Sequence, residues 1–119
     1  MPKSASCTIY HNPRCTKSRA TLALLQEHGI EPTVIEYLDH PPTATTLKTI
    51  LRKLGMKAEQ LARKGEDIYK ERWAGRELTD AKWVEVLVEH PVLIERPIVV
   101  MGERAVIGRP PENVLQLLK

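Results

Sequence analysis

The first forty residues switch between two hydrophobic periodicities, and this switching limits the possible folds more than any other feature of the sequence. Residues Cys7–Tyr10 favour a strand that ends at the turn-forming run His11-Asn12-Pro13. From Thr16 apolar residues recur at helical spacing until Gly29, and Thr33–Leu38 alternates like a second strand. A strand, a helix and a strand within about 35 residues predict a βαβ unit, with parallel strands and a right-handed crossover.

The middle of the chain is predicted to be helical. Thr43 is suited to cap a helix that ends at Gly55. Thr79-Asp80 opens a second amphipathic helix, which His90-Pro91 closes. Shorter helical turns are expected between these two helices.

The chain ends with two β-rich runs and one more helix. Ile98–Met101 and Arg104–Ile107 are separated by Gly102-Glu103, the spacing of a two-residue hairpin, and Pro110-Pro111-Glu112 begins a final helix. This order predicts an α/β fold, in which helices flank a mixed sheet of about four strands and a helical insertion precedes the last two strands. A length of 119 residues indicates one domain over residues 1–119.

Composition excludes several classes of protein. No apolar run exceeds four residues, whereas a membrane-spanning helix needs about 20. Residues 1–6 lack the apolar block of a secretory signal, so we expect a soluble, cytoplasmic protein without a membrane partner. Lys and Arg number 18 against 15 Asp and Glu, but they are spread along a chain without Phe, which argues against nucleic-acid binding. A small anionic ligand suits this mild positive excess better.

Cys15 is the candidate nucleophile. It follows the loop His11-Asn12-Pro13-Arg14 and lies where the first helix begins, so unpaired backbone N–H groups and the helix dipole favour its thiolate form. Ser18, one turn along, is expected to donate a hydrogen bond to the sulfur. Because the run Cys15-Thr16-Lys17-Ser18 has no second cysteine, no local thiol can resolve an intermediate on Cys15.

Other roles for these residues stay open. Cys15 also fits a small side chain packed under a loop. Cys7 is expected to be a buried strand residue, since it should lie about 13 Å from the strand's exit, beyond the ~7 Å Cα limit for a disulfide. Cys7, His11 and Cys15 do not share one helix face, so no metal site is predicted. His11 either hydrogen-bonds near the thiolate or satisfies the loop, and Asn12 suits a loop or capping position.

Four ordered motifs in the chain are similar to those of a known family. They are the run Tyr10–Arg19, the run Glu36-Tyr37-Leu38 with Pro41-Pro42-Thr43, the run His90–Val100, and Gly108-Arg109-Pro110. Over residues 8–118 the chain resembles the glutaredoxin-dependent arsenate reductases. The resemblance implies a thioredoxin-like fold with a helical insertion before the last two strands, which agrees with the element order above.

The resemblance also implies a site for an arsenic oxyanion. Guanidinium forks suit it, because arsenate is a tetrahedral anion like phosphate and because cations must offset its repulsion from an anionic sulfur. The peptide bond between Arg96 and Pro97 is expected to be cis. The implied residues are Cys15 as catalytic nucleophile, Arg63, Arg96 and Arg109 as substrate-binding groups, and His11, Asn12 and Ser18 in support.

The reaction implied by the resemblance begins when the Cys15 thiolate attacks As(V). Glutathione and then glutaredoxin resolve the adduct, which releases arsenite through a Cys15–S–As(III) intermediate. Glutathione is then a co-substrate, and a monomer is expected. No bound cofactor or metal is expected, because the sequence carries neither a phosphate-binding G-x-x-x-x-G-K nor a dinucleotide glycine fingerprint.

Two alternatives belong to the same fold. One is a thiol enzyme that acts on another oxyanion or on a glutathione-linked disulfide. The other is a redox regulator that binds RNA polymerase; such regulators usually sense through a C-x-x-C pair, whereas Ser18 occupies the second position here.

Overall fold

The computed structural model describes residues 6–118, which fall into two compact units. Unit 1 takes both ends of the chain, Met1–His40 and Arg96–Lys119, and unit 2 is the segment between them, Pro41–Glu95. The single domain expected over residues 1–119 stays a prediction.

Unit 1 is built on a mixed sheet with the strand order β2-β1-β3-β4. The first two strands are parallel, as predicted, and the last two form the predicted antiparallel hairpin, in which Met101 pairs with Arg104. Gly102 turns the hairpin with a φ of 62°, a left-handed conformation that favours glycine. The strands are β1 (Cys7–His11), β2 (Thr33–Glu36), β3 (Ile98–Met101) and β4 (Arg104–Ile107).

The second strand is shorter than predicted. The alternation of Thr33–Leu38 favours a strand to Leu38, but β2 ends at Glu36. The reason is a turn: the backbone N–H groups of Asp39 and His40 both donate to the carbonyl oxygen of Glu36, at 3.0 and 2.9 Å. Tyr37 is buried while Leu38 and Asp39 are exposed, so the chain leaves the sheet here.

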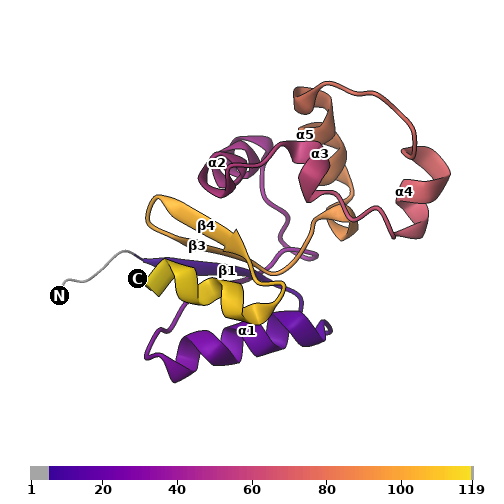
Figure 1. The fold of residues 1–119 in the computed structure, drawn as a ribbon. Coiled ribbons are helices and arrows are strands. Elements are labelled where there is room, and N and C mark those ends of the chain that lie inside the picture. Colours follow the sequence, from indigo (N-terminus) through magenta and orange to yellow (C-terminus); the bar gives the residue numbers. More distant parts are fainter. Residues whose placement is uncertain (1–5, 119) are drawn as a thin grey trace. The chain divides into compact units, whose positions relative to one another are not determined.

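Two helices pack on the sheet of unit 1 and cover the same face of it (Figure 1). They are α1 (Thr16–Glu27) and η2 (Pro111–Leu118). The predicted final helix has the tighter 3₁₀ form, and its first backbone bond runs from Asn113 N to Pro110 O, at 3.0 Å. The core between these layers contains Cys7, Ile9, Leu25, Val99, Val114 and Leu117.

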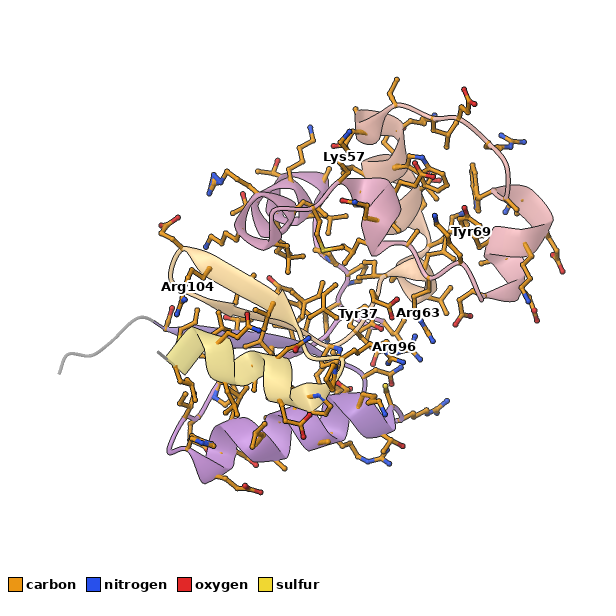
Figure 2. The ribbon with its side chains drawn as sticks, viewed as in Figure 1. Tyr37, Lys57, Arg63, Tyr69, Arg96 and Arg104 are labelled. Atoms are coloured by element: carbon orange, nitrogen blue, oxygen red, sulfur yellow. The ribbon has the colours of Figure 1, made fainter. Side chains whose placement is uncertain are left out.

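A side chain also ties the hairpin of unit 1 to its last helix. Arg104 Nη2 on β4 donates to the carbonyl oxygen of Leu117 in η2, at 2.9 Å (Figure 2). The late carbonyls of a helix have no partner within the helix, so this bond satisfies one of them.

Unit 2 is the helical insertion that the sequence predicts between the second and third strands. Thr43 and Thr79 cap helices as expected, each accepting the backbone N–H three residues on, at 3.1 Å. Asp80 Oδ1 accepts from Ala58 N at 2.8 Å, which joins α5 to α3. The helices are α2 (Ala44–Leu54), α3 (Ala58–Leu61), α4 (Asp67–Arg72), α5 (Asp80–Glu89) and η1 (Pro91–Leu93).

The architecture confirms the predicted fold class: a mixed α/β fold with a four-stranded sheet, flanking helices and a helical insertion before the last two strands. Over the described residues, none of the helices combines the length and the apolar character needed to cross a bilayer.

Candidate active site

The loop between β1 and α1 presents Cys15 at the N-cap of the helix. Cys15 has extended backbone angles and is partly exposed, and its carbonyl oxygen accepts the helical bond from Arg19 N at 3.0 Å. Asn12 closes the turn before it: its backbone carbonyl accepts from Cys15 N, and its side-chain Oδ1 accepts from Arg14 N, both at 3.0 Å. The structure therefore shows Asn12 in the loop-forming role open to it in the sequence.

Ser18 does not hydrogen-bond to the sulfur, contrary to expectation. Its side chain is fully buried; its Oγ accepts from Asn12 N at 3.0 Å and lies 2.6 Å from His11 Nδ1. A hydroxyl has one proton to donate, so when neutral His11 accepts it, none is left for Cys15. Ser18 and His11 thus fix the loop from inside rather than contacting the nucleophile.

Burial sets the ionisation of His11. Loss of hydration lowers the pKa of the His11 ring below its usual value, and the Arg19 guanidinium lowers it further, while the carboxylate of Glu36 raises it in part. Glu36 has this influence because it is the register partner of His11 across the parallel strands β1 and β2. A neutral ring suits the acceptor role toward Ser18.

Arg109 is brought directly to the sulfur. Its Nη1 lies 3.9 Å from Cys15 Sγ and 3.5 Å from the carbonyl oxygen of Arg96. Arg109 follows β4 and Arg96 precedes β3, so two strand ends and the N-terminus of α1 meet at this point of unit 1. The guanidinium of Arg109 donates toward the sulfur, so a positive charge lies beside Cys15.

Arg96 carries a buried hydrogen-bond donor, the Nε of its guanidinium. Its Nε is buried, and within the described part of the chain it has no hydrogen-bond partner. A buried donor without a partner is uncommon in a folded protein, and this one belongs to a charged group. The Arg96–Pro97 peptide bond is cis, as expected, and so is Arg109–Pro110.

Gly108 fixes the chain that carries Arg109 against α1. Its N–H donates to Pro97 O at 2.9 Å, and its carbonyl oxygen accepts from Thr21 Oγ1 at 3.3 Å. A Cβ at this position would lie 2.5 Å from Thr21 Oγ1, so only glycine allows the approach.

Arg63 lies in unit 2 and is held there by two carboxylates. Its Nη1 is 2.8 Å from Glu66 Oε2, and its Nε is 3.4 Å from Glu95 Oε1. Backbone bonds fix the segment: Arg63 N donates to Leu93 O, and Glu95 N to Leu61 O at 2.9 Å. The role predicted for Arg63 in binding substrate stays a prediction.

The second cysteine takes no part in this arrangement. Cys7 is 7% exposed, both cysteines are free thiols, and burial raises the pKa of the Cys7 thiol. A thiol that stays protonated is a poor nucleophile. Within residues 6–118 no three His, Cys, Asp or Glu side chains are grouped so that they could hold a metal ion.

A pocket of about 300 Å³ is lined in part by the same loop. Its two acidic residues, Glu36 and Asp39, are not among the site residues predicted from the sequence. The predicted βαβ unit was the available signal, because parallel strands bring their carboxyl ends to the same edge of a sheet; the register then sets Glu36 beside His11. The pocket is lined by His11, Asn12, Pro13, Arg14, Glu36, Leu38 and Asp39.

Comparison with known proteins places this geometry in a family. The ArsC family model matches residues 10–117. The chain is 51% identical to YfgD of Escherichia coli K12, named as uncharacterized, over 112 residues that cover 92% of this chain and 94% of YfgD. It is 44% identical to an arsenate reductase of Haemophilus influenzae over 115 residues, covering 95% and 99% of the two chains. The solved structure of an arsenate reductase from Vibrio cholerae is 47% identical and superposes with a TM-score of 0.90 over 95% of this chain and 98% of that one. The chain therefore belongs to the ArsC family.

Proposed function

We propose that this protein reduces arsenate to arsenite, with Cys15 as nucleophile and glutathione and glutaredoxin as the source of electrons. The observation that carries the proposal is the 3.9 Å approach of Arg109 Nη1 to Cys15 Sγ, at the start of a helix. Relatives named as arsenate reductases match nearly the whole chain and support this choice of substrate.

The electrostatics of the site suit an anionic substrate that meets an anionic nucleophile. Arg109 donates toward the sulfur before substrate binds. The buried Nε of Arg96 offers a second donor that an oxyanion would satisfy. Together two guanidiniums offset the repulsion between thiolate and arsenate and stabilise charge that develops as the S–As bond forms.

The chemistry balances with two thiols. The Cys15 thiolate forms an S–As(V) bond, and one arsenate oxygen leaves as water. A glutathione thiol next replaces a second arsenate oxygen, which also leaves as water, so that arsenic carries both sulfurs. The glutaredoxin thiolate attacks the glutathione sulfur and forms a mixed disulfide with it; the As–S bond to glutathione breaks and its electron pair stays on arsenic, which becomes As(III). Water then hydrolyses the bond between Cys15 Sγ and As(III), releasing arsenite and the free thiol. Overall, two thiols become one disulfide, and arsenate takes two electrons and two protons to give arsenite and water.

The test is arsenate-dependent NADPH oxidation in a coupled assay with glutathione, glutaredoxin and glutathione reductase. We expect the wild-type chain to be active and Cys15→Ser to be inactive. Cys7→Ala is the matched control and should keep its activity, because the Cys7 thiol is buried. Activity that persists in Cys15→Ser would remove Cys15 from the mechanism.

The electron donor is tested in the same assay. When thioredoxin and its reductase replace glutathione and glutaredoxin, we expect the rate to fall to background. The described fold offers no second thiol near Cys15 that thioredoxin could use, since the other cysteine, Cys7, is buried at the opposite end of β1. An equal rate with thioredoxin would reject glutaredoxin dependence and leave arsenate reduction standing.

A further inference from the structure

The pocket beside the nucleophile's loop lies where ligands commonly bind in α/β folds, outside the carboxyl ends of parallel strands. His11 is the last residue of β1 and Glu36 the last residue of β2, and the two are register partners. The turn after β2 supplies Leu38 and Asp39, and the loop after β1 supplies residues 12–14. Cys15 follows directly on Arg14, so the pocket adjoins the nucleophile along the chain.

The charges of this pocket are of both signs. Arg14 supplies a guanidinium, and Glu36 and Asp39 supply carboxylates. All three side chains are exposed, and none of them forms a salt bridge within residues 6–118. Two carboxylates disfavour an oxyanion such as arsenate, whereas a ligand that carries an ammonium beside a carboxylate can pair with both signs.

We propose that this pocket binds the γ-glutamyl end of glutathione. The inference rests on the proposed function, in which glutathione is the second substrate. Of the two small reactants, arsenate is purely anionic, and only glutathione carries an α-ammonium and an α-carboxylate on one carbon. The ammonium pairs with Asp39 and Glu36, and the carboxylate pairs with Arg14.

The size of the ligand fits the distance to be covered. A tripeptide spans about 10 Å when extended. A γ-glutamyl group anchored against Arg14 therefore leaves the central cysteine of glutathione within reach of Cys15, one residue further along the chain. The exposed Leu38, which lines the pocket, offers an apolar contact for the methylene groups of the γ-glutamyl chain.

The kinetic test separates the two substrates. Asp39→Asn removes one charge and keeps the shape; we expect it to raise the KM for glutathione about fivefold, the size of effect for an exposed ion pair, and to leave the KM for arsenate unchanged. Glu36→Gln should act in the same direction but also affects His11, so Asp39→Asn is the decisive variant. Glu31→Gln, an exposed carboxylate outside the pocket, is the matched control. An unchanged glutathione KM in Asp39→Asn overturns the inference.

A binding test does not depend on turnover. S-methylglutathione cannot react, so its titration into the wild-type chain is followed by amide chemical shifts. We expect the shifts to cluster at residues 11–14 and 36–39, and N-acetylation of the γ-glutamyl amine to weaken binding at least fivefold. Shifts elsewhere, or no effect of N-acetylation, reject the pocket. If this test succeeds while the wild-type chain fails to reduce arsenate, the glutathione site stands and the proposed function fails.

Discussion

In the proposed reaction, Arg109 is the cation at the nucleophile, since its Nη1 lies 3.9 Å from Cys15 Sγ. We expect Arg109→Gln to lower kcat/KM for arsenate about 100- to 1,000-fold, the usual cost of one donor to developing charge. Arg109→Lys should recover only part of this loss, because lysine restores the positive charge but not the paired donors of the guanidinium. The side chain is exposed, so thermal stability should not change. Arg52→Gln, on the exposed face of α2, controls for the lost charge; if Arg109→Gln stays within twofold of that control, the assignment is wrong.

His11 makes the stability of unit 1 depend on pH. Its pKa is lowered in the folded state, so the unfolded chain binds more protons between that lowered value and the ordinary 6.5. Stability should therefore be fully present above 6.5 and fall as the pH drops through this window. Chemical denaturation at a series of pH values checks this, and His11→Gln should flatten the curve there.

The two charges near His11 allow a sharper check of the same pKa. By NMR titration of the ring, Glu36→Gln should lower the pKa of His11 further, and Arg19→Gln should raise it, because the lost charges act in opposite directions. If both variants moved the pKa in the same direction, these charges would not be what acts on His11.

Arg63 is the predicted substrate ligand whose charge is already paired. Glu66 and Glu95 hold its guanidinium at 2.8 and 3.4 Å, so arsenate has to compete with carboxylates for it. If Arg63 binds substrate, Glu66→Gln should lower the KM for arsenate about two- to fivefold, and Arg63→Gln should raise it. Glu59→Gln, an exposed carboxylate on α3, is the control. Steady-state kinetics in which Arg63→Gln leaves this KM unchanged would take Arg63 out of the site.

At the scale of elements, the chain after β4 packs closely on α1 because residue 108 is a glycine. In Gly108→Ala the new Cβ would meet Thr21 Oγ1 at 2.5 Å and Pro97 Cγ at 3.0 Å. We expect a loss of about 1–3 kcal/mol in the free energy of unfolding, measured in urea, and a lower kcat, because Arg109 is the next residue. Adding Thr21→Ala removes the closest atoms, so the double variant should lose less than the sum of the two single variants. Strict additivity would contradict the contact.

The elements that the sequence predicts well are those whose signals are local. Thr43 and Thr79 cap helices, and the period of the residues between Thr16 and Gly29 gives α1, because each depends on neighbours within a few positions. The end of β2 was predicted two residues too late, since alternation cannot show that Glu36 O accepts two turn bonds.

The site was predictable only in part, because some of its contacts depend on packing and on strand register rather than on neighbours in the sequence. The position of Cys15 at a helix start follows from the chain order alone. The hydroxyl of Ser18 could be aimed at the sulfur or at His11 from the same helix turn, and only packing decides for His11. The parallel register brings Glu36 to His11, which neither segment shows separately.

At the scale of the whole molecule, the chain order ties the folding of the two units together. The sheet of unit 1 needs strands from both ends of the chain, since β1 pairs with β3, and residues 41–95 lie within the stretch of chain that this pairing closes. Closing a long unfolded loop costs entropy, by about 0.6 kcal/mol for each doubling of its length. A folded unit 2 already orders much of this stretch and so lowers the entropy cost of pairing β1 with β3. Folding of either unit therefore stabilises the other.

This coupling predicts one unfolding transition for residues 1–119, as for a single domain. Trp73 and Trp83 both lie in unit 2 and contact other rings there, so their fluorescence follows that unit. In a Cys15→Ser background the remaining thiol, Cys7, is buried in the core of unit 1, and its labelling rate follows the other unit. We expect the two probes to give the same urea midpoint. Midpoints that differ by more than about 0.5 M would show that the units unfold separately, and the chain would then count as two domains.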